Sequence, residues 1–186
     1  DPAIIERKRI MSKELFGQEF GAEFSVFEGK VWDFNRELDT GDFPYDSTLP
    51  TYCSIDFGFR QPAVLFLQTY WDQGLEHITI FDTILHKQNI KTEDLIKMIK
   101  TKGYPIMSFY GDPAGSNVQG QSGAGDMEIF RRSGIRVLST KDRKSRNIVN
   151  SVAYTRGFFE SAEGIRRIHV DKKCVDVILK IHLVLQ

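Results

Sequence analysis

The chain has 186 residues, 41% of them hydrophobic and 27% charged, and its 25 basic side chains balance its 25 acidic ones. This length predicts one domain with room for a sizeable core, and the composition excludes a wholly disordered chain. Cys53 and Cys174 lie far apart without a CxxC or Cys/His cluster, so we expect neither a disulfide framework nor a structural zinc site. No apolar run approaches the roughly 20 residues that a membrane-spanning helix needs.

The zero net charge conceals an asymmetry between the two halves of the chain. Residues 1–100 carry 11 basic and 17 acidic side chains, a balance of −6, whereas residues 101–186 carry 14 and 8, a balance of +6. The zero net charge of the whole chain therefore argues only weakly against a nucleic acid partner, because a basic second half is a candidate surface for a polyanion.

The first 50 residues differ in pattern from the rest. Apolar residues at helical spacing predict one amphipathic helix over residues 3–16. Residues 35–50 are rich in Asp, Gly and Pro, which is typical of a loop or linker. We therefore expect a leader or linker segment over residues 1–48 and a compact domain over residues 49–186.

The compact domain alternates strand and helix patterns. Three strands with short turns predict an antiparallel meander, and a helix capped by Thr92 follows and ends at Gly103. The expected strands are 52–57, 63–71, 75–85, 106–110 and 135–138, with 165–170 strand-like; the later helices are 126–132, 144–160 and 172–185. This order predicts an α/β, ribonuclease-H-like mixed five-stranded sheet, an antiparallel meander plus parallel strands, flanked by helices.

Two aspartates stand at the ends of strands that this fold places side by side. Asp56 ends the first strand and Asp112 ends the fourth. Close carboxylates repel each other unless a cation neutralises them, and Mg²⁺ suits hard carboxylate oxygens. The alternative is that each Asp is only a turn residue that bonds its own backbone.

A basic run lies after the second aspartate. Lys141, Arg143, Lys144 and Arg146 precede a predicted helix. A charge run of this kind is commonly the solvated start of a helix. The alternative is that it contacts phosphates, with salt-dependent and sequence-independent affinity.

Four stretches of the sequence resemble phage terminase large subunits, two of them in the nuclease domain and two in the segment before it. The stretch SIDFGFRQPA at 54–63 resembles the first acidic motif of that family, and YGDPAG at 110–115, followed by QSG and Asp126, is similar to the second. The stretches LFGQEFGAEF at 15–24 and GKVW at 29–32 resemble the segment that joins the packaging ATPase to the nuclease. The likeness extends over nearly the whole chain.

The resemblance implies a metal-dependent endonuclease that cuts concatemeric double-stranded DNA during viral genome packaging, with little sequence specificity. Asp56 and Asp112 match the first two metal ligands of the family. The resemblance implies that they would bind two ions of Mg²⁺ or Mn²⁺, which would carry out two-metal phosphodiester hydrolysis. A third ligand is expected late in the domain. Its motif is not found before Gln186, so the domain is expected to stop short of it; Asp171 and Asp176 are the nearest late acids, and Asp176 is the candidate that we keep.

The same resemblance implies the partners. Residues 1–48 would lead from the ATPase domain of the same polypeptide, and the portal protein and small terminase subunit would be further partners, in the host cytoplasm and without a membrane. The expected DNA-binding residues are Arg60, Lys141, Arg143, Lys144 and Arg146. Two alternatives stay open: a non-catalytic nucleic-acid-binding or assembly module, and another ribonuclease-H-like nuclease or transposase-like enzyme.

Overall fold

The computed structural model describes residues 1–21, 32–57, 61–85, 88–112, 125–139, 148–174 and 176–177, without the side chains of residues 148–150. The chain divides into two compact units. Unit 1 comprises residues 1–44, 70–79 and 142–186, and unit 2 comprises residues 45–69 and 80–141. A search of the described helices finds none that is long and apolar enough to cross a membrane.

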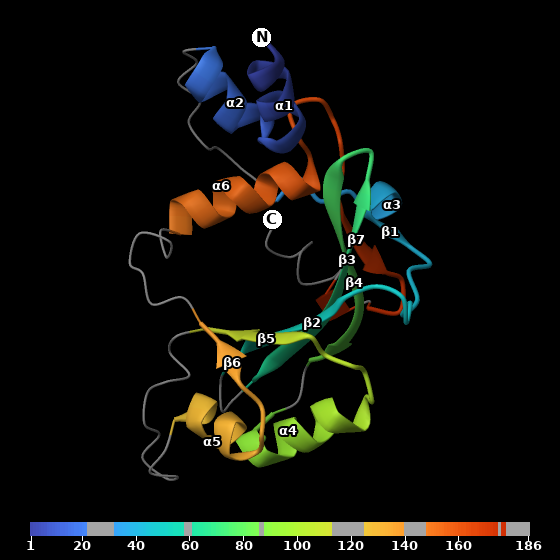
Figure 1. Ribbon diagram of the computed structural model, residues 1–186, viewed down its shortest axis with the longest axis vertical. Helices are drawn as coiled ribbons and strands as arrows, with labels where there is room; N and C mark the ends of the chain where they lie inside the picture. Colours follow the sequence, from blue (N-terminus) through green and yellow to red (C-terminus); the bar gives the residue numbers. More distant parts are fainter. Residues whose placement is uncertain are drawn as a thin grey trace. The chain divides into compact units, whose positions relative to one another are not determined.

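The strands of the described chain form a seven-stranded mixed sheet in the order β1-β7-β4-β3-β2-β5-β6 (Figure 1). Their bounds are β1 Thr40–Gly41, β2 Thr51–Asp56, β3 Ala63–Asp72, β4 Leu75–Ile84, β5 Ser108–Gly111, β6 Val137–Leu138 and β7 Ile168–Asp171. β2 pairs antiparallel with β3 and parallel with β5, and β5 pairs parallel with β6. The predicted ribonuclease-H-like α/β class is thereby confirmed.

The sheet is larger than the five strands expected. β2 to β6 correspond to the five predicted strands, and β1 and β7 pair parallel with each other. β1 has only two residues, in the stretch that we assigned to a linker, so it carries no alternating pattern of its own. Its pairing of Thr40 with Val170 joins segments far apart in the sequence, which local patterns do not report.

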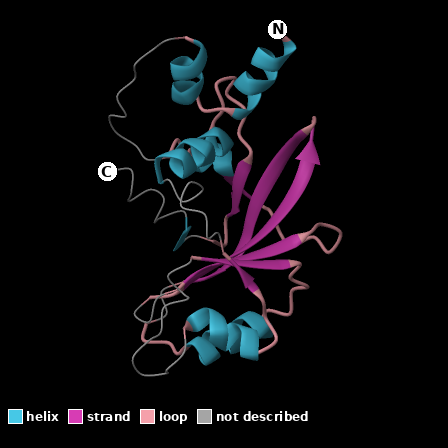
Figure 2. Cartoon of the chain, turned by 60° about the vertical axis from the view of Figure 1, so that its left-hand side comes forward, coloured by secondary structure: helices cyan, strands magenta, loops and turns pink. Residues whose placement is uncertain are grey.

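Unit 2 is built on a sheet face covered by helices α4, Thr92–Thr101, and α5, Asp126–Arg132 (Figure 2). Alternate residues of β2 are buried, with Cys53 and Ile55 on the core side. They join a cluster that includes Ile96 of α4 and Phe130 of α5. The period-two pattern of the strand therefore buries one face and leaves the other for polar groups.

Unit 1 holds the N-terminal helices and the last described helix. Their bounds are α1 Pro2–Ile10, α2 Lys13–Phe20, α3 Arg36–Asp39 and α6 Ile148–Phe159. The prediction of one helix over 3–16 is wrong, because Met11 is extended, with ψ 149°, and the Ser12 hydroxyl accepts the Leu15 N–H at 3.3 Å as a new N-cap. The start of the predicted helix 144–160 and most of 172–185 lie outside the described residues.

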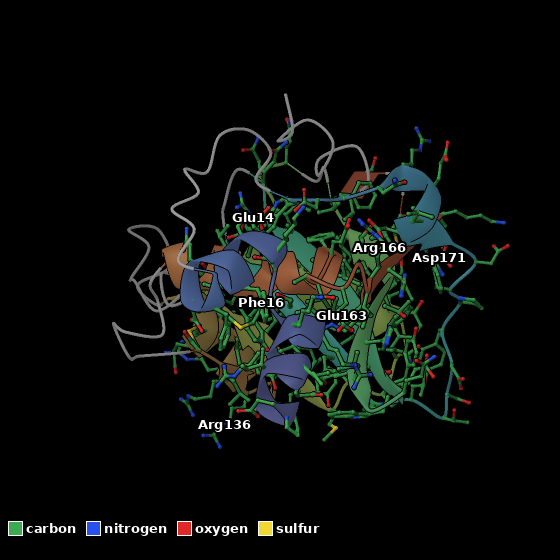
Figure 3. All side chains as sticks on the ribbon, turned by 90° about the horizontal axis from the view of Figure 1, so that it is seen from above. Glu14, Phe16, Arg136, Glu163, Arg166 and Asp171 are labelled. Carbon is green, nitrogen blue, oxygen red and sulfur yellow. The ribbon has the colours of Figure 1, made fainter. Side chains whose placement is uncertain are left out.

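A buried ion pair ties α3 to the segment before β7. Arg166, labelled in Figure 3, donates from Nη2 to Asp39 Oδ2 at 2.7 Å, and Asp39 is fully buried. Arg166 also pairs with Glu160, next to the end of α6. Cys53 and Cys174 are both free and buried, in agreement with the expectation of no disulfide framework.

Candidate functional site

The strand register brings the two predicted ligands to one edge of unit 2. In the parallel register of β2 and β5, Ser54 pairs with Tyr110 and Ile55 with Gly111. Asp56 and Asp112 are the residues that follow directly after these pairs. Neighbouring strands lie about 4.8 Å apart, and residues in register share a face. Both aspartates are exposed, and Asp56 alternates with the buried Ile55 toward the face opposite the α4 and α5 core.

Two tyrosines lie on the strands that carry these acids. Tyr52 is on β2 and Tyr110 on β5, with ring centroids 6.2 Å apart, and Tyr110 is 45% exposed. By strand alternation, Tyr52 shares a face with Asp56, and Tyr110 precedes Asp112 by two residues. Sequence reasoning did not select these tyrosines, although the same period-two count that placed the aspartates would have placed them too.

Asp126, which belongs to the second acidic motif, has a structural environment different from that of Asp112. It is the first residue of α5 and is only 6% exposed. The Thr92 hydroxyl donates a hydrogen bond to its Oδ1. The expected role of Thr92 as N-cap of α4 is wrong, because Lys91 occupies that position and Thr92 is the first residue of the helix.

A further acid of unit 2, Asp82 on β4, was not anticipated. Its Oδ2 accepts from Lys102 Nζ at 2.7 Å and from Tyr104 Oη at 2.8 Å. Burial acts to raise the pKa of Asp82, but hydrogen bonds from Lys102, Tyr104 and the Thr83 N–H outweigh it and lower the pKa. These hydrogen bonds thus stabilise the ionised form of Asp82 and tie β4 to Lys102 and Tyr104.

The other predicted site residues lie either outside the described residues or in unit 1. Arg60, Lys141, Arg143, Lys144 and Arg146 lie outside the described residues. Asp176 is exposed and belongs to unit 1. Within the described ranges, no group of three or more His, Cys, Asp or Glu residues is placed to hold a metal ion. The third ligand therefore stays unassigned.

Two histidines of unit 1 are packed in a stack of aromatic rings. His77 and His169 stack on each other with centroids 5.9 Å apart, flanked by Tyr70 and Phe43. Burial is the main cause that lowers the pKa of both imidazoles. The two rings are thus packed side chains in the described part of unit 1.

The chemistry of the Asp56 and Asp112 pair fits a hard divalent cation. Both are carboxylates, both are exposed, and their backbones are adjacent in a parallel register. Mg²⁺ and Mn²⁺ favour oxygen ligands, and Mg²⁺ in particular is held by one or two carboxylates together with water and substrate phosphates. The pair is therefore able to form one side of such a site.

The strand order is that of a ribonuclease-H-like fold, and comparison with known proteins shows what the chain is similar to. No family model matches the chain. It is 40% identical over 84 residues to the terminase large subunit of Escherichia phage T5, a match that covers 40% of this chain and 19% of that protein. The chain thus spans about a fifth of that relative.

Two solved structures share the fold. The P22 large terminase nuclease domain superposes with a TM-score of 0.61 at 17% identity, covering 84% of this chain and 79% of that one. The g2p large terminase nuclease domain of bacteriophage SPP1, with bound Mn, gives a TM-score of 0.52 at 10% identity and coverages of 77% and 76%. The resemblance to the nuclease domain of terminase large subunits, drawn first from the acidic motifs, is confirmed.

Proposed function

We propose that this chain is the metal-dependent endonuclease domain of a viral DNA-packaging terminase, cleaving concatemeric double-stranded DNA with little sequence specificity. The observation that carries the proposal is the register of β2 and β5, which sets Asp56 beside Asp112. The likeness to terminase nuclease domains supports the same conclusion. The Mn in the SPP1 domain supports the choice of Mg²⁺ or Mn²⁺ as cofactor, with two ions.

The two aspartates have a defined part in the proposed reaction. Bound at these carboxylates, the metal ions would activate water as the nucleophile and offset the charge of the scissile phosphate. Asp56 and Asp112, which are both exposed, would hold the cations where a polyanion has access. Their attachment to paired strands keeps the ligands more precisely placed than loop residues would be.

We assign phosphate binding to the basic residues that the sequence selected. Arg60, Lys141, Arg143, Lys144 and Arg146 would hold the duplex through its backbone, which gives affinity without sequence readout. The third acidic ligand is not identified, and Asp176 is kept only as the late acid that the sequence offers for that position. The packaging ATPase domain, the portal protein and the small subunit are the proposed partners, and the host cytoplasm the proposed location.

Plasmid cleavage by the purified chain in Mn²⁺ or Mg²⁺ tests the proposal. We expect Asp56→Asn and Asp112→Asn to abolish cleavage with an unchanged circular dichroism spectrum. Asp94→Asn is the matched control, because Asp94 is an exposed acid of α4 that pairs with Lys97. Cleavage that survives both site substitutions would contradict the nuclease assignment, and DNA binding without cleavage in either metal would favour a non-catalytic module.

A further inference from the structure

A tight contact between a phenylalanine and a glycine joins the two strand ends on their core side. Phe57 directly follows Asp56, and Gly111 directly precedes Asp112. A Cβ atom on Gly111 would lie 2.6 Å from Cε2 of Phe57 and 2.9 Å from Cγ1 of Val137. Both distances are under 3.0 Å, the limit below which a neighbour must move. The Phe57 ring therefore occupies the space of a side chain at position 111.

The Phe57 ring is itself packed against the core of unit 2. Phe57 packs edge to face on Phe130 with centroids 5.7 Å apart, and Phe130 is fully buried. Val137, the second neighbour of Gly111, is 8% exposed and lies on β6, the strand next to β5. Phe57, Phe130 and Val137 all belong to or pack against the core cluster of unit 2. Because such interiors are close-packed, an added methyl group requires the Phe57 ring, the Val137 side chain or β5 itself to shift.

The contact is coupled to the acids by chain adjacency. Displacement of Phe57 moves the backbone that carries Asp56, and displacement of β5 moves the backbone that carries Asp112. Ligands that share a cation must hold their geometry within about 0.5 Å. A methyl group added at position 111, on the core side of the Asp56 and Asp112 pair, would force a movement that is large compared with this tolerance.

We infer that Phe57 and Gly111 are positioning residues that set the spacing of the Asp56 and Asp112 carboxylates for a shared divalent cation. The inference rests on the proposed function, since it names the residues that shape the same metal site. Neither residue supplies an atom to the cation. They act through the two backbones, as packing partners that fix the ligands on paired strands.

The test is Mn²⁺ binding to the purified chain, measured by electron paramagnetic resonance of free Mn²⁺ without DNA. We expect Gly111→Ala to raise the Mn²⁺ dissociation constant about 10-fold to 100-fold, the range typical of groups that support metal ligands. The double variant Gly111→Ala/Phe57→Leu, in which the ring edge is removed, should regain affinity. Phe57→Leu alone should weaken binding, which tests the inference even if Gly111→Ala does not fold.

Ile99→Val is the matched control, because Ile99 is 4% exposed in the same core cluster but on α4. It should lower stability and leave the Mn²⁺ dissociation constant unchanged. Wild-type affinity in Gly111→Ala and Phe57→Leu, with loss of affinity in Asp56→Asn, would overturn the inference and leave the proposed function standing. A wild-type chain that neither binds Mn²⁺ nor cleaves DNA would overturn both.

Discussion

The hydroxyl of Thr92 donates a hydrogen bond to the carboxylate of Asp126, so the first residues of α4 and α5 are joined directly. The two helices also share the core cluster through Ile96 and Phe130. The bond fixes the start of α5, the next described helix after Asp112. A carboxylate at a helix N-terminus is further stabilised by the helix dipole.

Breaking this bond should destabilise unit 2. We expect Thr92→Val to lower the free energy of unfolding by about 1.5–3 kcal/mol, because a buried carboxylate then loses a donor. Urea denaturation measures the loss. The matched control is Thr101→Val on the same helix, where the hydroxyl is exposed and donates to the Lys97 carbonyl. Its cost should stay within about 0.5 kcal/mol, and equal costs at both positions would reject a special role for the Asp126 bond.

The Thr92 contact also shows why sequence patterns misplace some groups. A threonine before an acidic first turn predicts an N-cap, but its hydroxyl here bonds an acid 34 positions away in the sequence. Similarly, the break of the N-terminal helix at Met11 and the two-residue strand β1 depend on packing and pairing with distant segments. Local propensity contains no information about these partners.

The positions of Asp56 and Asp112 were predictable for the opposite reason. Each ends an apolar strand whose type and direction follow from local alternation and element order, and the structure pairs these strands in parallel. The Phe57 and Gly111 contact was not predictable, because it depends on the exact register of the strands. The metal-binding role of the aspartates stays a prediction.

Asp82 provides a prediction about a pKa. Tyr104→Phe removes one of the hydrogen bonds to its carboxylate while burial persists, so the pKa of Asp82 should rise. The lowered pKa contributes stability that is present above the unfolded value of about 3.9 and is lost as the pH falls through the folded value. Nuclear magnetic resonance titration of the Asp82 carboxyl measures the shift. Tyr154→Phe, an exposed tyrosine in unit 1, should leave it unchanged.

The stacked histidines predict acid sensitivity of unit 1. Burial lowers the pKa of His77 and His169, so below pH ~6.5 the unfolded chain binds protons that the folded chain does not. Stability is therefore full above that pH and falls as the pH drops toward the lowered folded values. Nearby charges act in both directions. Asp72 raises and Arg167 lowers the pKa of His77, and Asp39 raises and Arg166 lowers the pKa of His169.

We expect His169→Phe to keep the ring stack and reduce this pH dependence. Thermal unfolding at pH 8 and pH 5 should show a smaller fall in melting temperature for the variant than for the wild type. Thr155→Val, on α6, removes an uncharged hydroxyl that donates to the Ser151 carbonyl and should keep the wild-type dependence. An equal fall in wild type and His169→Phe would show that other groups cause the acid sensitivity.

The substitution Asp56→Asn should have opposite effects on stability with and without bound metal. Asp56→Asn relieves repulsion of the Asp112 carboxylate, so the metal-free variant should be at least as stable as the wild type. Mn²⁺ at 100 times its dissociation constant should stabilise the wild type by about 2.7 kcal/mol and the variant much less. Thermal unfolding with and without Mn²⁺ measures both effects. Equal stabilisation of the two proteins would place the bound cation elsewhere.

Gly157 lies in close contact with the backbone of Ile10 and Ser12, and we expect this contact to be essential to unit 1. It lies on α6, and a Cβ there would overlap the carbonyl oxygen of Ile10 and lie 3.2 Å from the Ser12 nitrogen. Arg167, which is 4% exposed, donates from Nη2 to the carbonyl oxygens of both Ile10 and Gly157 at 3.0 Å. An added methyl group would therefore separate the turn between α1 and α2 from α6 and break a bridge made by a buried arginine.

We expect Gly157→Ala to cost about 1–3 kcal/mol of stability, the usual cost of overpacking. Because the strain lies at the Met11–Ser12 turn, backbone amides of α1 and α2 should exchange hydrogen faster, while amides of α4 in unit 2 keep their protection. Ser151→Ala, an exposed position of α6, is the control and should stay within about 0.5 kcal/mol of the wild type. Exchange that accelerates equally in both units would show global destabilisation, in contradiction to a local contact between Gly157 and the N-terminal helices.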